Sequence, residues 1–248
     1  MDQYGLIGNP LKHSFSQGFF NDKFAAENID AEYVNFEIPK IEELTAIIKN
    51  NPRLKGLNVT IPYKEKVIPL LDRLSENAQL IGAVNVIKIE RGKKGKPLLT
   101  GYNSDIIGFK NSIEPLLQTR HTKALILGTG GSAKAIFYGL KQLGVVGTYV
   151  SRTKTAENIL TYSELNEEVM NTNTVIVNCT PVGMFPNIDN CPDIPYHLVS
   201  KEHLLYDLLY NPNETLFMKK GKEQKATVKN GLEMLLLQAF ASWDFWKQ

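Results

Sequence analysis

A lysine and an aspartate are the side chains of this sequence best suited to proton transfer. Lys64 ends the run NVTIPYK, where an expected strand leads into an expected helix, and Asp105 follows GYNS at the start of another helix. An ammonium can donate a proton to a developing alkoxide. A carboxylate within reach would form an ion pair with that ammonium and a hydrogen bond with a substrate hydroxyl. The simpler alternatives are a solvated lysine and a helix-capping aspartate. The pair suits reduction of a ketone, which needs a hydride from a nicotinamide and no metal.

Further polar side chains stand near expected strand ends, where ligands collect in open α/β sheets. Ser14 and Ser16, at the start of a helix, can offer hydroxyls and backbone N–H groups to a carboxylate, or one of them can simply cap the helix. Thr60 is expected at the same sheet edge as Lys64. Asn85, inside an apolar segment, is either a ligand or a satisfied structural amide. Together these groups fit a small polyhydroxylated acid.

A glycine-rich turn follows the apolar strand expected at residues 124–127. Gly128, Gly130 and Ala133 form a GxGxxA pattern directly before a helix. Gly128 would permit the tight turn, Gly130 would let the backbone approach a pyrophosphate, and Ala133 would allow close packing of helix on strand. A plain turn is the alternative, but the position between strand and helix favours dinucleotide binding.

The next strand ends in the run SRTK, residues 151–154, where an NAD-binding protein usually has an acidic residue. The guanidinium of Arg152 and the ammonium of Lys154 suit a 2′-phosphate, which a carboxylate would repel. Arg152 could otherwise be a surface residue that caps the following helix. The sequence therefore favours NADP over NAD.

The elements that must position these residues alternate between strand and helix. In the first part of the chain we expect strands at 4–8, 33–38 and 56–61, helices at 15–24, 41–49 and 64–71, and a hairpin formed by 82–90 and 97–102. This alternation predicts a mainly parallel sheet covered by helices.

The second part shows the same alternation around the glycine turn. We expect helices at 104–117 and from the glycine turn to 144, and strands at 124–127, 148–150, 175–179 and 204–208. This order is typical of a nucleotide-binding Rossmann half. The last segment, 231–246, is an apolar-rich helix with no strand after it, so we expect it to pack back on the first domain.

Composition limits the class of protein. The 248 residues suffice for two domains, and 43% hydrophobic with 22% charged residues describe an ordinary globular protein. The net charge of +2 is too small for a nucleic-acid-binding face. The basic cluster is interleaved with glycine and indicates a solvated hairpin turn; its members are Arg91, Lys93, Lys94 and Lys96.

The cysteines and the N-terminus point to the cytoplasm. Cys179 and Cys191 have no metal-binding spacing and are expected as free thiols. The N-terminus lacks the pattern of a signal peptide, and no apolar stretch approaches the length of a membrane span. We expect a cytoplasmic protein without metal, membrane or nucleic-acid partners.

Blocks spread in order over nearly the whole chain resemble the shikimate dehydrogenase family. They are GLIGNPLKHSFS, LNVTIPYKE, IGAVNVI, GYNSDIIGF, GTGGSAKA, SRT, NCTPVGM, YDLLYNP and NGLEMLLLQA. The resemblance implies NADPH-dependent, reversible reduction of 3-dehydroshikimate to shikimate, a step of aromatic amino acid biosynthesis, by a monomer or homodimer. It also implies a discontinuous architecture, with a substrate domain of residues 1–102 and 229–248 and a Rossmann-like NADP domain of residues 103–228.

The resemblance implies a role for each matching residue. At the substrate these are Ser14, Ser16 and Tyr210 for the carboxylate, and Thr60, Asn85, Asp105 and Gln238 for the ring hydroxyls. Lys64 would be the catalytic acid/base, paired with Asp105. At the cofactor they are Gly128, Thr129, Gly130, Gly131, Ser132 and Ala133 for the pyrophosphate, Ser151, Arg152, Thr153 and Lys154 for the adenosine phosphate, Thr180, Val182 and Met184 for the nicotinamide side, and Glu76, Leu208 and Gly231 for weaker contacts.

The chain departs from the family pattern at three places. Gln17 replaces a usual proline and Phe20 a usual histidine, both away from the expected chemistry. The segment between Arg152 and Val175 is shorter than is common, which implies loss of a helix or part of one near the adenine. The alternatives are an NAD-using quinate/shikimate dehydrogenase, against which Arg152 argues, and a non-catalytic homologue, against which the intact Lys64 and Asp105 argue. A methylenetetrahydrofolate dehydrogenase would need a larger pterin pocket.

Overall fold

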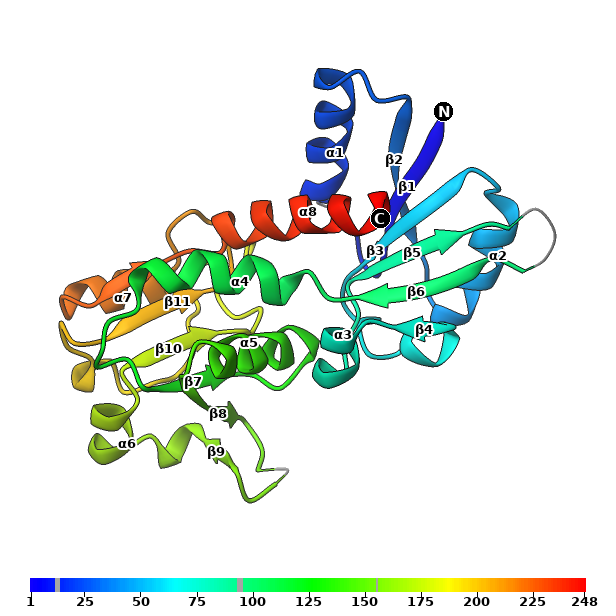
Figure 1. The fold of residues 1–248 in the computed structure, drawn as a ribbon. Helices are drawn as coiled ribbons and strands as arrows, with labels where there is room; N and C mark the ends of the chain where they lie inside the picture. The colour runs from blue at the N-terminus through cyan, green and yellow to red at the C-terminus, as the bar shows by residue number, and fades with distance from the viewer. Residues whose placement is uncertain (12–13, 93–95, 155) are drawn as a thin grey trace. The chain divides into compact units, whose positions relative to one another are not determined.

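The computed structural model describes residues 1–11, 14–92, 96–154 and 156–248, which form two compact units (Figure 1). Unit 1 consists of Met1–Ser104 and Ala239–Gln248, and unit 2 of Asp105–Gln238. The first boundary, expected at 102/103, thus falls at 104/105. The second, expected at residue 229, falls at 238/239, inside the last helix. Lys93 and Lys94 of the basic cluster lie outside the described residues.

Unit 1 is built on a six-stranded mixed sheet in the order β2-β1-β3-β5-β6-β4. Its strands are β1 (Asp2–Gly8), β2 (Ala31–Glu37), β3 (Leu54–Val59), β4 (Arg73–Leu74), β5 (Val86–Glu90) and β6 (Leu98–Tyr102). β1 runs parallel to β2 and β3, whereas β5 is antiparallel to β3 and β6. The expected hairpin is therefore confirmed. The helices of this unit are α1 (Phe15–Ala26), α2 (Leu44–Asn50) and α3 (Glu76–Ile81).

The helix expected at residues 64–71 is wrong. This segment forms turns that end in a 3₁₀ helix, Ile68–Leu70. Pro69 is the physical reason, because it has no N–H to donate and its ring would clash with the carbonyl of Glu65 in an α-helix. The segment 82–90 also differs from the expectation, since its strand begins only at Val86, after the short helix α3.

Two apolar layers cover the sheet of unit 1. One is aliphatic and gathers Ile7, Leu44, Leu57 and Ile87 among others. The other is aromatic and contains Tyr4, Phe20, Phe24, Tyr33, Trp243 and Trp246. The tryptophans belong to α8 (Leu232–Lys247), so the end of this helix packs on the sheet as the sequence predicted. Trp246 donates its Nε1–H to the carbonyl of Ile87, 3.1 Å away.

Unit 2 contains a six-stranded, fully parallel sheet in the order β12-β11-β10-β7-β8-β9. Its strands are β7 (Lys123–Leu127), β8 (Val146–Ser151), β9 (Ile159–Thr161), β10 (Val175–Asn178), β11 (Leu204–Asp207) and β12 (Thr227–Lys229). Numbered within the unit and read from β9, the order is 3-2-1-4-5-6, the complete doubly wound arrangement. The sequence predicted four of these six strands, which were interpreted as a Rossmann half. Ligands of such sheets bind where the order reverses, between β7 and β10.

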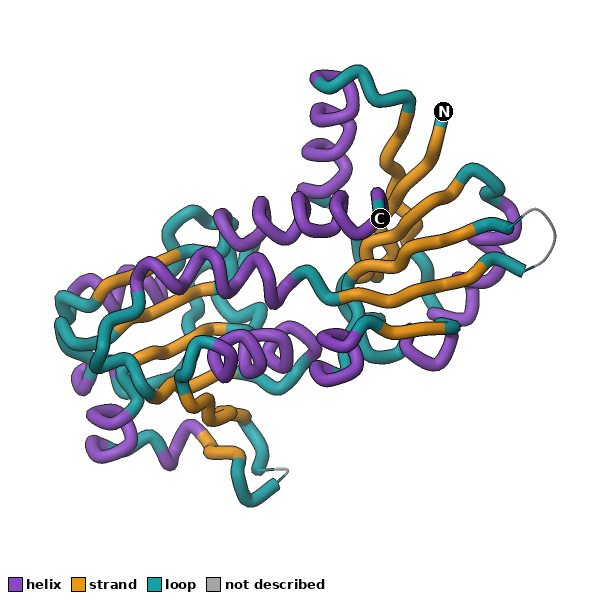
Figure 2. The backbone as a smooth tube through the Cα atoms, in the orientation of Figure 1, coloured by secondary structure: helices purple, strands orange, loops and turns teal. Residues whose placement is uncertain are grey.

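The helices of unit 2 are α4 (Asp105–Ile113), α5 (Gly131–Gln142), α6 (Glu167–Thr172) and α7 (Leu216–Glu223), with the first part of α8. Figure 2 shows helices on both sides of the orange strands. The helix expected at 104–117 ends at Ile113 because Pro115 cannot continue the backbone ladder, and a 3₁₀ turn follows it. In the segment between β8 and β10, β9 and the six-residue α6 are present.

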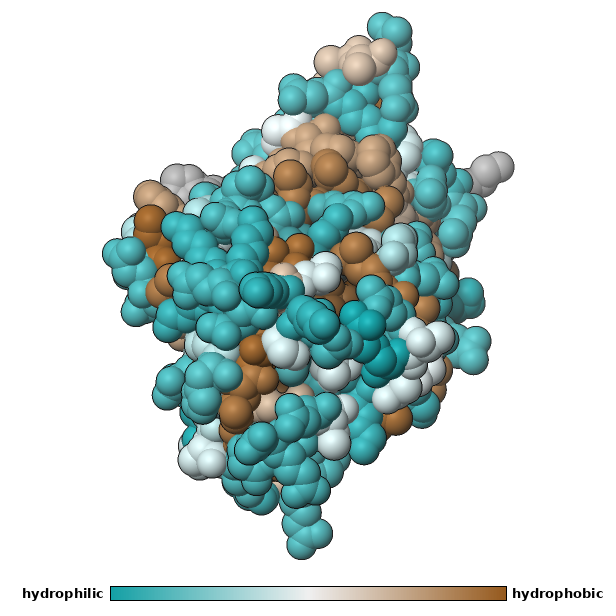
Figure 3. All heavy atoms as spheres, turned by 90° about the vertical axis from the view of Figure 1, so that its left-hand side faces the viewer, coloured by the Kyte–Doolittle hydropathy of each residue, from teal (hydrophilic) through white to brown (hydrophobic). Residues whose placement is uncertain are grey.

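Figure 3 shows one face of the molecule, on which hydrophilic residues predominate and brown apolar patches are scattered. Among the described residues, no helix combines the length and apolarity that crossing a membrane requires. Nor do three or more potential ligands from His, Cys, Asp and Glu gather into a metal-binding group within the described ranges.

Candidate functional site

The N-terminus of α1 carries the first pair of expected substrate ligands. Ser14 is the N-cap, and its Oγ accepts from the N–H of Gln17 at 3.4 Å. Ser16 lies in the first turn and hydrogen bonds Tyr33, which lowers the pKa of that phenol, although burial raises it more. Ser14 therefore does cap the helix. The first N–H groups of α1 and both hydroxyls form a place that favours an anion.

The ends of β1 and β3 bring Thr60 next to the chain that leads to α1. The N–H of Thr60 donates to the carbonyl of Ile7 at 2.9 Å, and the N–H of Asn9 to that of Ile61 at 3.1 Å. Gly8 lies so close to the methyl of Thr60 that a Cβ would overlap it. The hydroxyl-bearing Thr60 is thus held at the carboxyl edge of the sheet.

Lys64 reaches the same edge through a turn. The N–H of Tyr63 donates to the carbonyl of Thr60 at 2.9 Å, and the carbonyl of Lys64 accepts from Val84 at 2.7 Å. Val84 precedes Asn85 in the chain. The structure therefore collects Thr60, Lys64 and Asn85 at one sheet edge, although a turn and not the expected helix carries Lys64. The side chain of Lys64 is half-buried.

Asn85 is held by a chain of buried hydrogen bonds. Its Oδ1 accepts from the N–H of Ser104 at 2.7 Å, and its Nδ2 donates to the Oγ of Ser104 at 2.9 Å. Ser104 Oγ is 3.0 Å from the Oγ of Ser242, on α8. Ser242 Oγ accepts from Asn58 Nδ2 at 3.0 Å, and Asn58 Oδ1 accepts from the Tyr33 hydroxyl at 2.8 Å. Ser16 is the next group along, so one chain joins α1 to Asn85.

Sequence reasoning assigned no role to the middle of this chain. Tyr33, Asn58, Ser104 and Ser242 are all buried. Asn58 gave the one available signal, because an amide in the buried strand β3 needs a partner. The serine on α8 gave none, since its partners are distant in sequence.

Unit 2 places Asp105 and Gln238 on neighbouring helices. Asp105 opens α4 and is 5% exposed. One turn later, Gly108 packs against α8, where an added Cβ would stand 2.5 Å from the carbonyl of Met234 and 3.0 Å from Cβ of Gln238. The charge of Asp105 contributes to the raised pKa of the Cys179 thiol, which burial raises most. Asp105 therefore lies near the end of β10.

The glycine loop fits the pyrophosphate of a dinucleotide. Gly128 has φ +106°, which only glycine adopts easily, and its N–H donates to Val150 at 2.8 Å. Gly130 is the N-cap of α5, and a Cβ there would meet no atom within 4 Å. Bare backbone thus borders open space at the start of a twelve-residue helix. Such a helix start offers unpaired N–H groups to an anion.

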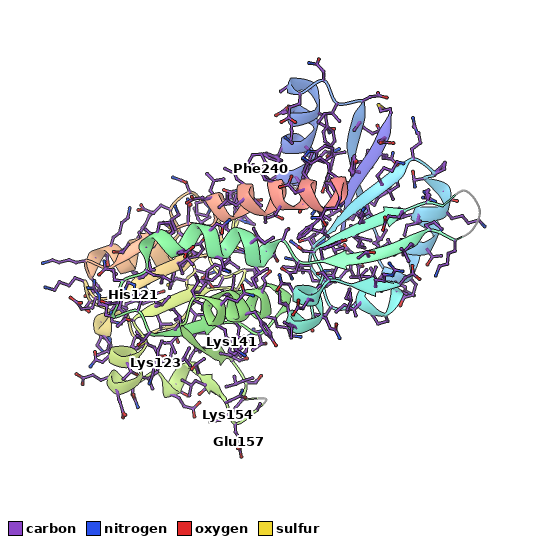
Figure 4. The ribbon with its side chains drawn as sticks, in the orientation of Figure 1. His121, Lys123, Lys141, Lys154, Glu157 and Phe240 are labelled. Atoms are coloured by element: carbon purple, nitrogen blue, oxygen red, sulfur yellow. The ribbon has the colours of Figure 1, made fainter. Side chains whose placement is uncertain are left out.

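The run after β8 is exposed and basic. Arg152, Thr153 and Lys154 are solvent-accessible, and Lys154 reaches out from the unit in Figure 4. Its Nζ lies 2.7 Å from Glu164 Oε1, and this bond, together with those from Thr161, lowers the pKa of Glu164 to about 2. Lys154 is therefore paired, and Arg152 is the better candidate for a phosphate.

The segments after β10 and β11 carry the remaining expected cofactor residues. Val182 is 37% and Met184 47% exposed, which gives an apolar surface beyond the sheet. Gly231 lies directly against the backbone of Leu208. Tyr210 is half-buried, and burial raises its pKa. The last of the set, Glu76, is exposed at the start of α3 in unit 1.

Known proteins match both the sequence and the fold. A family model described as the shikimate dehydrogenase substrate binding domain matches residues 6–87. A protein from Aquifex aeolicus named shikimate dehydrogenase (NADP(+)) is 39% identical over 253 residues, which cover 98% of this chain and 90% of that protein. The chain belongs to the shikimate dehydrogenase family.

Solved structures of shikimate dehydrogenases share the fold. A crystal structure from Aquifex aeolicus has a TM-score of 0.86 and 36% identity, with 99% of this chain and 92% of that chain covered. A crystal structure from Thermus thermophilus, in complex with NADP(H) and shikimate, has a TM-score of 0.85 and 28% identity, with 99% and 93% covered. The shikimate dehydrogenase fold therefore extends over both units of this chain.

Proposed function

We propose that this protein is an NADP-dependent shikimate dehydrogenase that interconverts 3-dehydroshikimate and shikimate. The observation that carries the proposal is the collection of Thr60, Lys64 and Asn85 at one edge of the unit 1 sheet by backbone hydrogen bonds. A relative named shikimate dehydrogenase (NADP(+)) matches 98% of this chain and supports the proposal.

The substrate carboxylate would bind at the N-terminus of α1. Ser14 and Ser16 supply hydroxyls there, and the first N–H groups of the helix add a partial positive charge. Tyr210 would assist. The ring hydroxyls would be bound by Thr60, Asn85, Asp105 and Gln238. The amide of Asn85 has a fixed orientation because both its Oδ1 and its Nδ2 form hydrogen bonds with Ser104.

Lys64 would transfer the proton. In the reductive direction its ammonium donates a proton to the oxygen of the ketone as that oxygen gains negative charge, and in the oxidative direction its amine accepts the proton back. Asp105 would stabilise the ammonium and bind a hydroxyl of the ring. Burial keeps the Asp105 carboxylate largely out of bulk water, which strengthens both interactions.

Unit 2 would hold the cofactor. When bound, NADPH supplies the hydride. The glycine loop, residues 128–133, would bind the pyrophosphate, Ser151 to Lys154 the adenosine phosphate, and Thr180, Val182 and Met184 the nicotinamide side. Leu208 and Gly231 would add weaker contacts, and Glu76, on α3, is proposed as a further weak contact. Arg152 favours NADP, since its guanidinium can bind a 2′-phosphate that NAD lacks.

The proposal is tested by mixing purified protein with shikimate and NADP⁺ and following NADPH formation, with 3-dehydroshikimate identified as the product. We expect turnover that depends on both compounds. Folded protein that forms no NADPH with shikimate would contradict the proposed function.

A further inference from the structure

Asp207, at the end of β11, is a buried carboxylate with no role in the proposed reaction. Its side chain is 0% exposed. Oδ2 accepts from the Thr215 hydroxyl at 2.6 Å, and Oδ1 accepts from the N–H of Leu209 at 3.1 Å and from Nδ2 of Asn178 at 3.0 Å. Burial raises the pKa of Asp207 to about 6, against the opposite effect of these hydrogen bonds. Burying such a group is costly, so its presence calls for a function.

Asn178 links Asp207 to the segment after β10 through hydrogen bonds. It is also 0% exposed. Because its Nδ2 donates to Asp207, its Oδ1 must face the other way, where it accepts from the N–H of Thr180 at 3.0 Å and from the Thr180 hydroxyl at 2.7 Å. The Oγ1 of Thr180 in turn accepts from the N–H of Val182 at 3.3 Å. The amide orientation of Asn178 thus decides where Thr180 and Val182 lie.

Asp207 anchors a second segment directly. Its bond to the N–H of Leu209 fixes the start of the run 208–212. The carbonyl of Leu209 accepts from the N–H of Gly231 at 2.9 Å. The carbonyl of Asn211 accepts from the N–H of Phe185 at 3.2 Å, which ties this run to the segment after β10. Hydrogen bonds therefore connect the Asp207 carboxylate, directly or through neighbouring residues, to the segments proposed for the nicotinamide half of the cofactor.

We propose that Asp207 is a positioning residue for the nicotinamide half of the cofactor site, acting through Asn178 on Thr180 and Val182 and through Leu209 on the run 208–212. The inference rests on the proposed NADP binding. The adenosine phosphate is assigned to another segment, residues 151–154, to which Asp207 makes no hydrogen bond among the described residues. Asp207 therefore acts on one half of the cofactor and not on the other.

The test compares two ligands in equilibrium binding: NADP⁺, which has both halves, and adenosine 2′,5′-bisphosphate, which has only the adenosine half. For Asp207→Ala we expect NADP⁺ binding to weaken about tenfold to a hundredfold, the range for losing hydrogen bonds to a charged group. Binding of adenosine 2′,5′-bisphosphate should stay within about twofold of wild type. Asp207→Asn should restore most of the NADP⁺ affinity, because its Oδ1 can still accept from Leu209 and Asn178.

A second variant covers the case in which Asp207→Ala does not fold. Asn178→Leu removes the relay but leaves the bonds of Asp207 to Thr215 and Leu209, and we expect the same selective loss of NADP⁺ affinity. Thr215→Val is the matched control. It removes one partner of Asp207 and the N-cap of α7, so it should lower the melting temperature without selective loss of NADP⁺ affinity.

Two results would overturn the inference: equal weakening of both ligands in the folded variants, which indicates a merely structural role, and unchanged NADP⁺ binding in both Asp207→Ala and Asn178→Leu. Failure of the proposed function is a separate result, since it would show in the wild type as no binding of NADP⁺ at all. Binding is measured without shikimate, so the outcome does not depend on turnover.

Discussion

The residue type of Lys64 predicted a role in proton transfer, whereas only the backbone structure shows how Lys64 is held in position. The sequence identified a lysine at a strand end, but it suggested a helix where the chain makes turns around Pro62 and Pro69. What holds Lys64 in place is its carbonyl, which accepts from Val84 beside Asn85. This pairing joins segments about twenty residues apart, and no local pattern encodes it.

Replacement of Lys64 by Ala tests the proton transfer. We expect kcat for shikimate oxidation to fall by about 100-fold to 10,000-fold, the usual contribution of a positioned acid/base, with a much smaller change in KM. The measurement is steady-state kinetics at saturating NADP⁺. A near-normal kcat would assign the proton to another group, and a change confined to KM would make Lys64 only a binding cation.

Ser242 illustrates a residue that sequence reasoning could not find. A serine on an apolar-rich helix carries no signal by itself, and its partners Asn58 and Ser104 lie 184 and 138 residues away. Only the packing of α8 on the sheet of unit 1 completes the chain from Tyr33 to Asn85.

For Ser242→Ala we expect KM for shikimate to rise about threefold to tenfold, because Ser104, the hydrogen-bond partner of Asn85, loses its own partner Ser242. We expect kcat to change little. The variant should also lose about 1–3 kcal/mol of stability through the unpaired buried groups. Ser112→Ala is the matched control. Ser112 is equally buried and bonds the Tyr206 hydroxyl at 2.6 Å, in unit 2. An equal rise of KM in both variants would refute a specific role for Ser242.

At the scale of elements, the strands with apolar runs were predicted and the short polar elements were not. The strands β7, β10 and β11 are continuous apolar runs buried on both faces, which makes them recognisable. By contrast, β9 and β12 have three residues each and α6 has six, too short for a periodic pattern. The sequence therefore predicted four of the six strands of the unit 2 sheet and missed β9 and β12.

The glycine loop allows fold and binding to be separated. Gly130→Ala should leave the melting temperature unchanged or slightly higher, because its φ of −77° suits alanine and a Cβ would meet open space. The same methyl would face the pyrophosphate, so we expect NADP⁺ affinity to fall at least about tenfold. Binding titrations and thermal melts of the same samples provide the measurement.

Gly128→Ala is the counterpart. Gly128 has φ +106°, and a new Cβ would lie only 3.3 Å from Thr180 Cγ2. We therefore expect this substitution to lower the melting temperature as well as the affinity for NADP⁺. If Gly130→Ala also destabilised the fold, or if it bound NADP⁺ normally, the assignment of open space at this loop to the pyrophosphate would be wrong.

At the scale of the molecule, the sequence predicted two α/β units and a returning last helix. It could not predict that the division falls inside α8, with Gln238 in unit 2 and Ala239 in unit 1. An amphipathic pattern shows that a helix is buried but not which partner covers each of its turns. Aromatic packing explains the return, since Trp243 and Trp246 complete the aromatic layer over Tyr4 and Phe24.

The pH dependence of stability should report Asp207. Its pKa rises from 3.8 to about 6 in the fold, so the folded chain binds the proton more tightly than the unfolded chain. Its contribution to stability is therefore fully present below about pH 4 and declines as pH rises to about 6. The neighbouring Cys179 and Tyr196 both have a raised pKa, chiefly through burial, and stay neutral in this window.

We accordingly expect Asp207→Asn, which lacks this titration, to gain stability relative to wild type as pH rises. The gain should be about 2 kcal/mol between about pH 4.5 and pH 7.5. Denaturant unfolding of both proteins at the two pH values provides the comparison. A stability difference that does not change with pH would show that Asp207 is not titrating in this range.

The proposed activity is tested most directly by measuring kcat/KM for the four combinations of shikimate or quinate with NADP⁺ or NAD⁺. We expect shikimate with NADP⁺ to be the best pair, because Arg152 can bind the 2′-phosphate and the polar residues at the edge of the unit 1 sheet fit the ring hydroxyls. The advantage of NADP⁺ over NAD⁺ should be at least about tenfold, from a charged phosphate contact of roughly 1.5–3 kcal/mol. A preference for NAD⁺ or for quinate, or no turnover with any pair by protein that is folded, would contradict the proposed activity.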